Sequence, residues 1–169
     1  MGLVDRAIQV AWYLRPDLDE ASEQWALQWL NPLQLALWAQ MGEADRAHAV
    51  RVARRLAARG APGWVLEAAL LHDCGKPSSY GLVPRVVGVL LARWLAPVPR
   101  FPRLRGAWRW LQIYRWHDHE GFEQARLAGT SEAALALLGL YGGIQPPEAP
   151  VHAGAPAWLG PLRACDAEG

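Results

Sequence analysis

A histidine and an aspartate stand side by side at His72-Asp73, directly after the apolar run Val65–Leu71. Imidazole nitrogens and carboxylate oxygens are both good ligands for divalent first-row metals. A packed apolar helix that ends at this pair could aim both side chains at one point and hold them still. The stretch therefore predicts a buried metal site. Lys76 follows one turn later, where its ammonium group could meet an anionic group of a substrate.

The composition predicts that helices position this pair. Ala, Leu and Arg dominate, whereas Ile and Thr are few, which favours helices over strands. The chain has 169 residues, more than half of them hydrophobic, enough for one domain with a proper core. Apolar residues recur at helical spacing. The expected helices cover residues 3–14, 20–30, 32–41, 43–58, 62–72, 83–95, 104–116, a stretch after Gly121 to about Ala128, 131–140 and a short 161–167.

Three other groups could join the pair. His48 lies in the first two turns of the helix expected at 43–58, next to its apolar stripe, and Asp166 lies in the last short helix. Taken alone, such a histidine is more often part of the core, and an aspartate near a chain end is commonly just solvated. A second pair, His117-Asp118, lacks a preceding apolar helix end and a following Gly-Lys. We interpret Asp118 as a helix N-cap.

Together these residues resemble the motif of the HD domain superfamily, whose members are all-helical and largely metal-dependent phosphohydrolases. The family has a first histidine on one helix, an HD pair at the end of the next and a distant aspartate on a late helix. The most specific match is the run His72-Asp73-Cys74-Gly75-Lys76, and Asp45-Arg46-x-His48 also fits. The resemblance implies an all-α HD-type bundle at residues 43–169, with residues 1–42 as extra N-terminal helices packed on it in one compact unit.

The resemblance also implies a cofactor and a reaction. One divalent metal would be held by His48, His72, Asp73 and Asp166, and sequence does not choose among Mn, Fe, Mg, Co, Ni and Zn. A metal-activated water would then attack a nucleotide or another small phosphorylated substrate. The residues expected to act in catalysis are Asp73, Lys76 and His119.

His119 raises the question of a second metal. The segment from His119 to Glu132 resembles one that in many HD proteins reads His-Pro-Glu-x-Gly-Ala and then forms a helix. In the two-metal branch that histidine binds the second metal, and the helix ends in another histidine. Here the helix ends in Leu138-Gly139-Leu140-Tyr141-Gly142, so a second ligand set would be incomplete. His119 is a partial second-site ligand, a phosphate contact or a proton donor to the leaving oxygen.

Two other functions stay open. The domain could be a metal-binding regulatory or binding module with weak or no catalysis, or an oxygenase of the kind that uses two irons, against which the incomplete second site counts. We expect no nucleic-acid motif, and an oligomer is compatible with the many Trp and Leu residues. The segment 76–116 has seven arginines, four tryptophans and no acidic residue. Its positive face is either merely solvated, a rim for an anionic substrate, or a weak contact with an acidic membrane through residues 85–116.

The spacing of the cysteines and the lengths of the apolar stretches indicate the cellular compartment. Cys74 and Cys165 are far apart and form no CxxC motif, so no disulfide framework is expected. Cys74 should point into the helix packing. No secretory signal is recognised at the N-terminus, and no apolar stretch is long enough to cross a membrane. We therefore expect a cytoplasmic, reduced protein.

Overall fold

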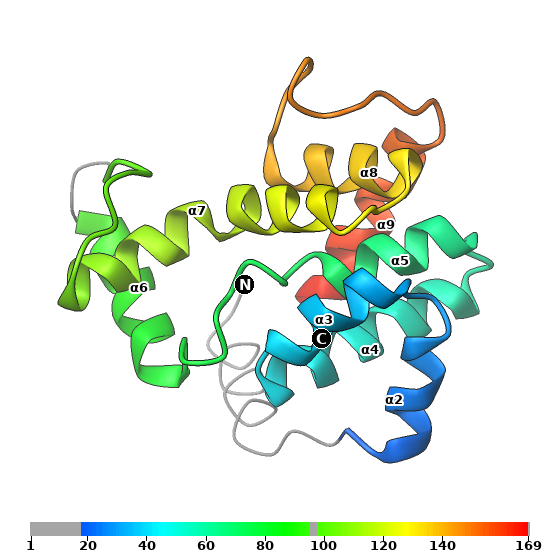
Figure 1. The fold of residues 1–169 in the computed structure, drawn as a ribbon, viewed down its shortest axis with the longest axis horizontal. Coiled ribbons are helices and arrows are strands. Elements are labelled where there is room, and N and C mark those ends of the chain that lie inside the picture. Colours follow the sequence, from blue (N-terminus) through cyan, green and yellow to red (C-terminus); the bar gives the residue numbers. More distant parts are fainter. Residues whose placement is uncertain (1–17, 95–97, 169) are drawn as a thin grey trace.

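The structure is a computed structural model that describes residues 18–94 and 98–168. Within these residues the chain is all-helical and has no strand, which confirms the all-α fold class (Figure 1). The expected helix at 3–14 lies outside the described residues. The helices are α2 (Glu20–Leu27), α3 (Pro32–Gln40), α4 (Glu43–Ala58), α5 (Gly63–Leu71), α6 (Leu82–Trp94), α7 (Gly106–Leu127), α8 (Glu132–Gly142) and α9 (Ala155–Ala167).

Helix α5 lies at the centre of the main group of helices, which we call the body: α2 to α5, the second half of α7, α8 and α9. Six of its nine residues are buried, and they lie on all sides of the helix. A helix that is apolar all round must be covered by neighbours on every side. Here α4 and α8 cover α5, and α9 packs on both α4 and α8. The pair His72-Asp73 therefore directly follows a helix that the surrounding core holds in place.

The N-terminal helices are tied to the body by buried polar groups. A capping box of Asn31 and Gln34 starts α3. The same Gln34 side-chain amide donates to Glu67 Oε1 at 2.5 Å and to Thr130 Oγ1 at 2.9 Å. The Asn31 amide donates to the Ala128 carbonyl at 3.0 Å. These bonds join α3 to α5 and to the turn between α7 and α8.

Helix α7 corrects one expectation. It runs without interruption over 22 residues, so the break expected at residues 117–121 and the N-cap role of Asp118 are wrong. Gly121 does not end a helix; it allows a close approach. A Cβ at position 121 would lie 2.9 Å from the backbone nitrogen of Gly75, on the turn that follows His72-Asp73. The glycine therefore serves the packing of that turn against α7.

Helix α9 is also longer than expected. It begins at Ala155 rather than at residue 161, and Pro161 lies inside it. An internal proline removes one backbone hydrogen bond and crowds the preceding turn. Burial of Leu162 and Cys165, both fully inaccessible, offsets that cost. The longer helix carries Asp166 on a packed element.

Helix α6 and the first half of α7 lie to one side of the other helices, and we call the described residues 82–94 and 98–115 the arm (Figure 1). Helix α6 packs mainly on α7. Among the described residues, no helix has the length and apolar character needed to cross a membrane.

We predict that Gly75→Ala lowers the free energy of unfolding by at least about 2 kcal/mol, because overpacking against rigid backbone is costly. The added Cβ would overlap the His117 carbonyl oxygen and lie 2.5 Å from Gly121 N. Urea denaturation measures the change. Gly42→Ala is the control, since its nearest neighbour would be a side-chain oxygen at 3.3 Å, and it should cost less than about 1 kcal/mol. Equal losses would contradict the close-approach argument.

Candidate metal centre

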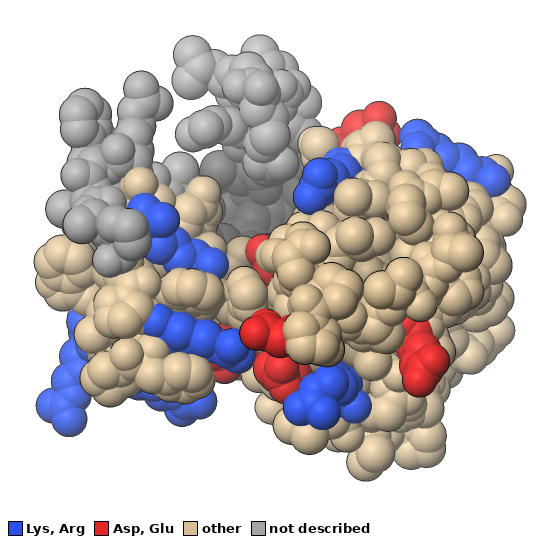
Figure 2. Space-filling view, turned by 90° about the horizontal axis from the view of Figure 1, so that it is seen from above, with Lys and Arg blue, Asp and Glu red and all other residues tan. Residues whose placement is uncertain are grey.

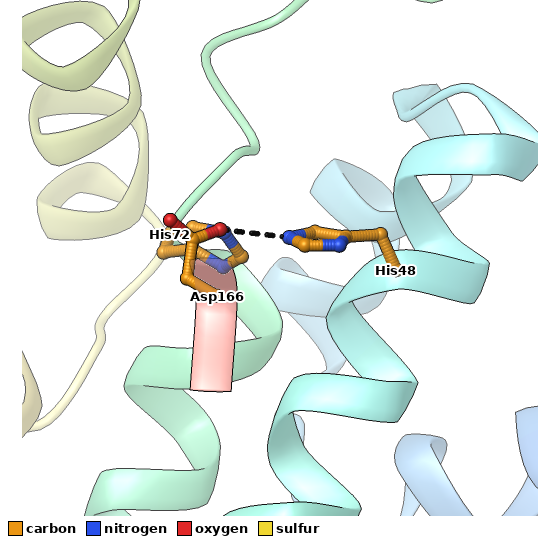
Figure 3. A group of neighbouring side chains, drawn as sticks. All are labelled: His48, His72 and Asp166. Carbon is orange, nitrogen blue, oxygen red and sulfur yellow. Dashed lines mark hydrogen bonds and ion pairs between the residues drawn. The ribbon is translucent and has the colours of Figure 1, made fainter. Parts of the chain in front are cut away.

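Three helices bring His48, His72 and Asp166 together (Figure 3). His48 comes from α4, His72 ends α5 and Asp166 lies in the last turn of α9. Asp166 Oδ1 lies 2.9 Å from His48 Nε2 and 3.4 Å from His72 Nε2. One ligand atom from each residue lies within 4.8 Å of the others, so the group could hold a metal ion. Which metal would bind is not decided by these three groups.

The orientation of His72 fits a ligand. Its Nδ1 lies 2.8 Å from the Ala69 carbonyl, which only accepts, so Nδ1 carries the hydrogen. In the neutral imidazole the other ring nitrogen, Nε2, then offers its lone pair. This atom is buried and has no hydrogen-bond partner among the described residues. Metal-binding histidines are commonly held in this way, with the second nitrogen donating to a carbonyl. Nε2 of His72 is therefore suited to bind a metal ion.

The electrostatics of the site also favour a cation. Burial disfavours the charged form of His72, but the nearby carboxylates of Asp73 and Asp166 outweigh it and raise its pKa to about 9. Burial likewise disfavours ionised Asp166, yet its hydrogen bond with His48 and the nearby His72 lower the pKa of this carboxyl. The carboxylates thus attract positive charge to this point, and a metal cation that bound here would displace the proton from His72.

Tyr141 orients the carboxylate of Asp166. The tyrosine hydroxyl donates to Asp166 Oδ2 at 2.8 Å, so Oδ1 is left to face the two histidines. Burial and the neighbouring Asp166 raise the pKa of Tyr141, which keeps its proton available as a donor. Sequence reasoning noted this position only as one without a histidine. The contact links α8 to the site.

Asp73 lies beside the group rather than within it. Its Oδ2 is 3.7 Å from His72 Nε2 and accepts from Lys76 Nζ at 2.5 Å. Burial disfavours the ionised carboxyl, but Lys76 and His72 hold the pKa of Asp73 well below its ordinary value. Asp73 is thus a carboxylate next to the three-residue group. Its role as a fourth ligand stays a prediction, as do the catalytic roles of Asp73 and Lys76.

His117, rather than His119, is the α7 histidine that faces Asp73. Its Nδ1 lies 3.2 Å and 3.1 Å from two backbone carbonyls of the preceding turn, and its Nε2 lies 3.9 Å from Asp73 Oδ1 and 3.3 Å from Asp118 Oδ1. Burial and the nearby Lys76 lower the pKa of His117.

The continuity of α7 explains which histidine faces the site. Residues two apart on a helix point in nearly opposite directions, whereas residues four apart share a face. Gly121 packs against the turn at Gly75, and His117 is four residues before it. His119 instead packs its ring on Trp116, at 5.2 Å between centroids. The three roles considered for His119 stay predictions.

Cys74 points into the helix packing, as expected. Its side chain is buried, and its thiol donates to the Gly121 carbonyl at 3.4 Å. Cys74 and Cys165 are both free thiols. Cys74 thus belongs to the contact between the turn and α7 and not to the ligand group.

Comparison of the chain with family models, curated proteins and solved structures found no match in any of the three. The geometry above is therefore what supports the metal centre.

We predict that Tyr141→Phe weakens metal binding about 10- to 100-fold, the usual cost of losing a group that orients a ligand. The ring would stay in place while the bond to Asp166 Oδ2 is lost. Titration with a metal indicator measures the affinity. Tyr114→Phe, on the exposed side of α7, is the matched control and should change nothing. Unchanged affinity in Tyr141→Phe would contradict the orienting role.

We predict that Cys74 resists alkylation in the folded protein. Burial and the charge of Asp73 raise its pKa to about 12, so at pH 8 only about one thiol in ten thousand is a thiolate. Iodoacetamide labelling followed by peptide mass spectrometry, at a series of pH values, distinguishes Cys74 from Cys165. Labelling in urea should be fast. Rapid labelling of Cys74 at pH 8 without urea would show that the turn opens readily.

Proposed function

We propose that this protein is a metal-dependent phosphohydrolase of the HD superfamily that acts on a nucleotide or another small phosphorylated molecule. The observation that carries the proposal is the buried, unpartnered Nε2 of His72, which faces His48 and Asp166 where three helices meet. Two histidines and an aspartate come together from distant parts of the chain, in the order that the resemblance implies. A cytoplasmic setting belongs to the same proposal.

The proposed ligands are the three clustered residues with Asp73 as the fourth. The group to be bound is one divalent ion from the set Mn, Fe, Mg, Co, Ni and Zn. When bound, such an ion supplies a Lewis acid that lowers the pKa of water and polarises a phosphoryl oxygen. Imidazole and carboxylate, without a thiolate, suit any of these metals, since neither cysteine lies in the group.

Lys76 is the proposed phosphate contact. Its side chain is 16% exposed, against 5% for Asp73, so it is the outer member of the ion pair. A phosphate oxygen that approaches Asp73 would meet this ammonium group, which binds as a point charge. The neutral imidazole of His117 lies near Oδ1 of Asp73, the carboxylate oxygen that does not pair with Lys76. We propose that His117 contacts phosphate or transfers a proton, the functions first considered for His119.

A regulatory or binding module is the second candidate. It is favoured by the ion pair of Asp73 with Lys76 and by Tyr141 at the position where a further histidine was sought. A protein of this class would bind metal without turnover. A third candidate, a two-iron oxygenase, requires a second metal, for which His117 with the nearby Asp118 and Oδ1 of Asp73 would be the ligands to test.

We predict that the purified protein binds one divalent metal per chain and that His72→Ala and Asp166→Ala abolish this binding. Elemental analysis after dialysis against Mn, Zn or Fe gives the stoichiometry. His152→Ala is the control, because that imidazole packs on Trp64 at 4.9 Å between ring centroids. Metal retained by both site variants would overturn the proposed centre, and two irons per chain would favour the oxygenase.

We predict that the metal-loaded protein hydrolyses at least one compound in a panel of nucleotides and generic phosphate esters. Lys76→Gln should lower kcat/KM about 10- to 100-fold, the cost of a lost charge-assisted hydrogen bond. Phosphate release measures the rate, and Arg59→Gln on the body is the matched control for loss of one positive charge. Bound metal with no turnover on the whole panel would favour the regulatory module.

A further inference from the structure

The arm exposes a stripe of aliphatic side chains on α6. Val83, Val86 and Leu90 are 63%, 45% and 55% exposed. Their spacing of three and four residues places them on one face of the helix. Exposed aliphatic residues scattered singly need no explanation, but three along one helix face form a patch that water solvates poorly. We call these three residues the α6 stripe.

The α6 stripe faces away from α7. Gly88 marks the opposite side of the helix, since a Cβ there would lie 2.7 Å from the Tyr80 hydroxyl and 3.3 Å from the Trp110 carbonyl. Residue 88 is turned about 140° from residue 83 around a helix axis of 3.6 residues per turn. The contact that fixes α6 on α7 therefore leaves the stripe uncovered by α7. Elsewhere on the arm Phe101 and Trp108 are also exposed, at 62% and 51%.

The charged residues of the arm itself are all cationic, and one of them, Arg100, pairs with Glu120 further along α7 at 3.2 Å. From Lys76 to Trp116 the sequence has eight cationic residues and no acidic one. Figure 2 shows Lys and Arg side chains on the arm, with residues other than Lys, Arg, Asp and Glu between them. Arg103 and Arg105 are exposed, and neither forms an ion pair with another described residue. An anionic partner would thus find both positive charge and apolar area on the arm.

We propose that the arm binds to the surface of a membrane that contains anionic phospholipids. The α6 stripe would enter the boundary between headgroups and acyl chains, and the arginines would contact lipid phosphates. Exposed Trp and Phe side chains are suited to that boundary, and arginine can reach phosphate from a partly immersed helix. The arm would lie on the surface and not cross the membrane, in keeping with the absence of a spanning helix among the described residues.

The chemistry of the patch favours lipid over two other occupants. A second copy docked arm to arm would bring two wholly cationic segments together, which is unfavourable. A nucleic acid would use the arginines and the two aromatic rings, but it would leave the three aliphatic side chains without a partner. Only a surface that is anionic outside and apolar beneath uses all of these groups.

The test is co-sedimentation of the full chain with vesicles. We expect binding to vesicles of phosphatidylglycerol and phosphatidylcholine, weaker binding at high salt, and little binding to phosphatidylcholine alone. The double variant Arg103→Gln/Arg105→Gln should reduce binding about tenfold or more at low salt. The double variant Val86→Ser/Leu90→Ser should reduce it at both salt concentrations. Matched controls on the body, Arg59→Gln and Leu127→Ser, should bind as the natural sequence does; Leu127 is 73% exposed.

Circular dichroism of each variant establishes that a loss of binding is not a loss of fold. The proposal is overturned if the folded natural protein does not sediment with anionic vesicles at low salt, or if both arm variants bind as well as the controls. It is also overturned if single-stranded RNA binds and displaces the vesicles while Val86→Ser/Leu90→Ser has no effect. Light scattering that shows a dimer lost in Val86→Ser/Leu90→Ser, together with no vesicle binding, would assign the stripe to a second copy.

Discussion

The carboxylate of Asp166 is the interaction on which the site depends. One oxygen faces His48 and His72, and the other accepts from Tyr141. This single side chain therefore connects α4, α5, α8 and α9 at one point. Its partners lie 118, 94 and 25 residues away in the sequence, by difference of their numbers. The body of the molecule can close around these groups only if α9 is held at this position.

Such a cluster is costly to build. Asp73 and His72 are almost fully buried, and buried charges lower stability unless they are paired. Lys76 pairs with Asp73, and His72 lies between two carboxylates, so the charges compensate in part. Apolar residues of similar volume would serve a purely structural role at least as well. The group of His48, His72 and Asp166 could hold a metal ion, and buried titratable groups with strongly shifted pKa values are typical of functional sites.

The turn after α5 packs on α7 and so positions His117 beside Asp73. Gly75 and Gly121 let the turn and α7 approach backbone to backbone. This contact places Nε2 of His117 3.9 Å from Oδ1 of Asp73. From the same contact α7 continues outward as part of the arm. The proposed membrane contact uses α6 and the first half of α7, and His117 lies near the middle of the same helix α7. Any binding event on the arm would act on a helix that also carries a side chain of the site.

The sequence by itself determined the helical class and the residues with metal chemistry. Composition and apolar spacing predict helices near most of the observed positions, because burial of one face imposes that period. The pair at the end of α5 was identifiable from its residue types, and His48 and Asp166 were added through the resemblance to a family motif. What the sequence did not reveal was the continuity of α7, because the close approach of Gly121 to Gly75 depends on tertiary packing. His119 was assigned through its resemblance to a family segment, and in the structure it is His117 that lies near Asp73. Tyr141 was missed for a related reason, since its bond to Asp166 joins two helices whose relative position only the tertiary packing decides.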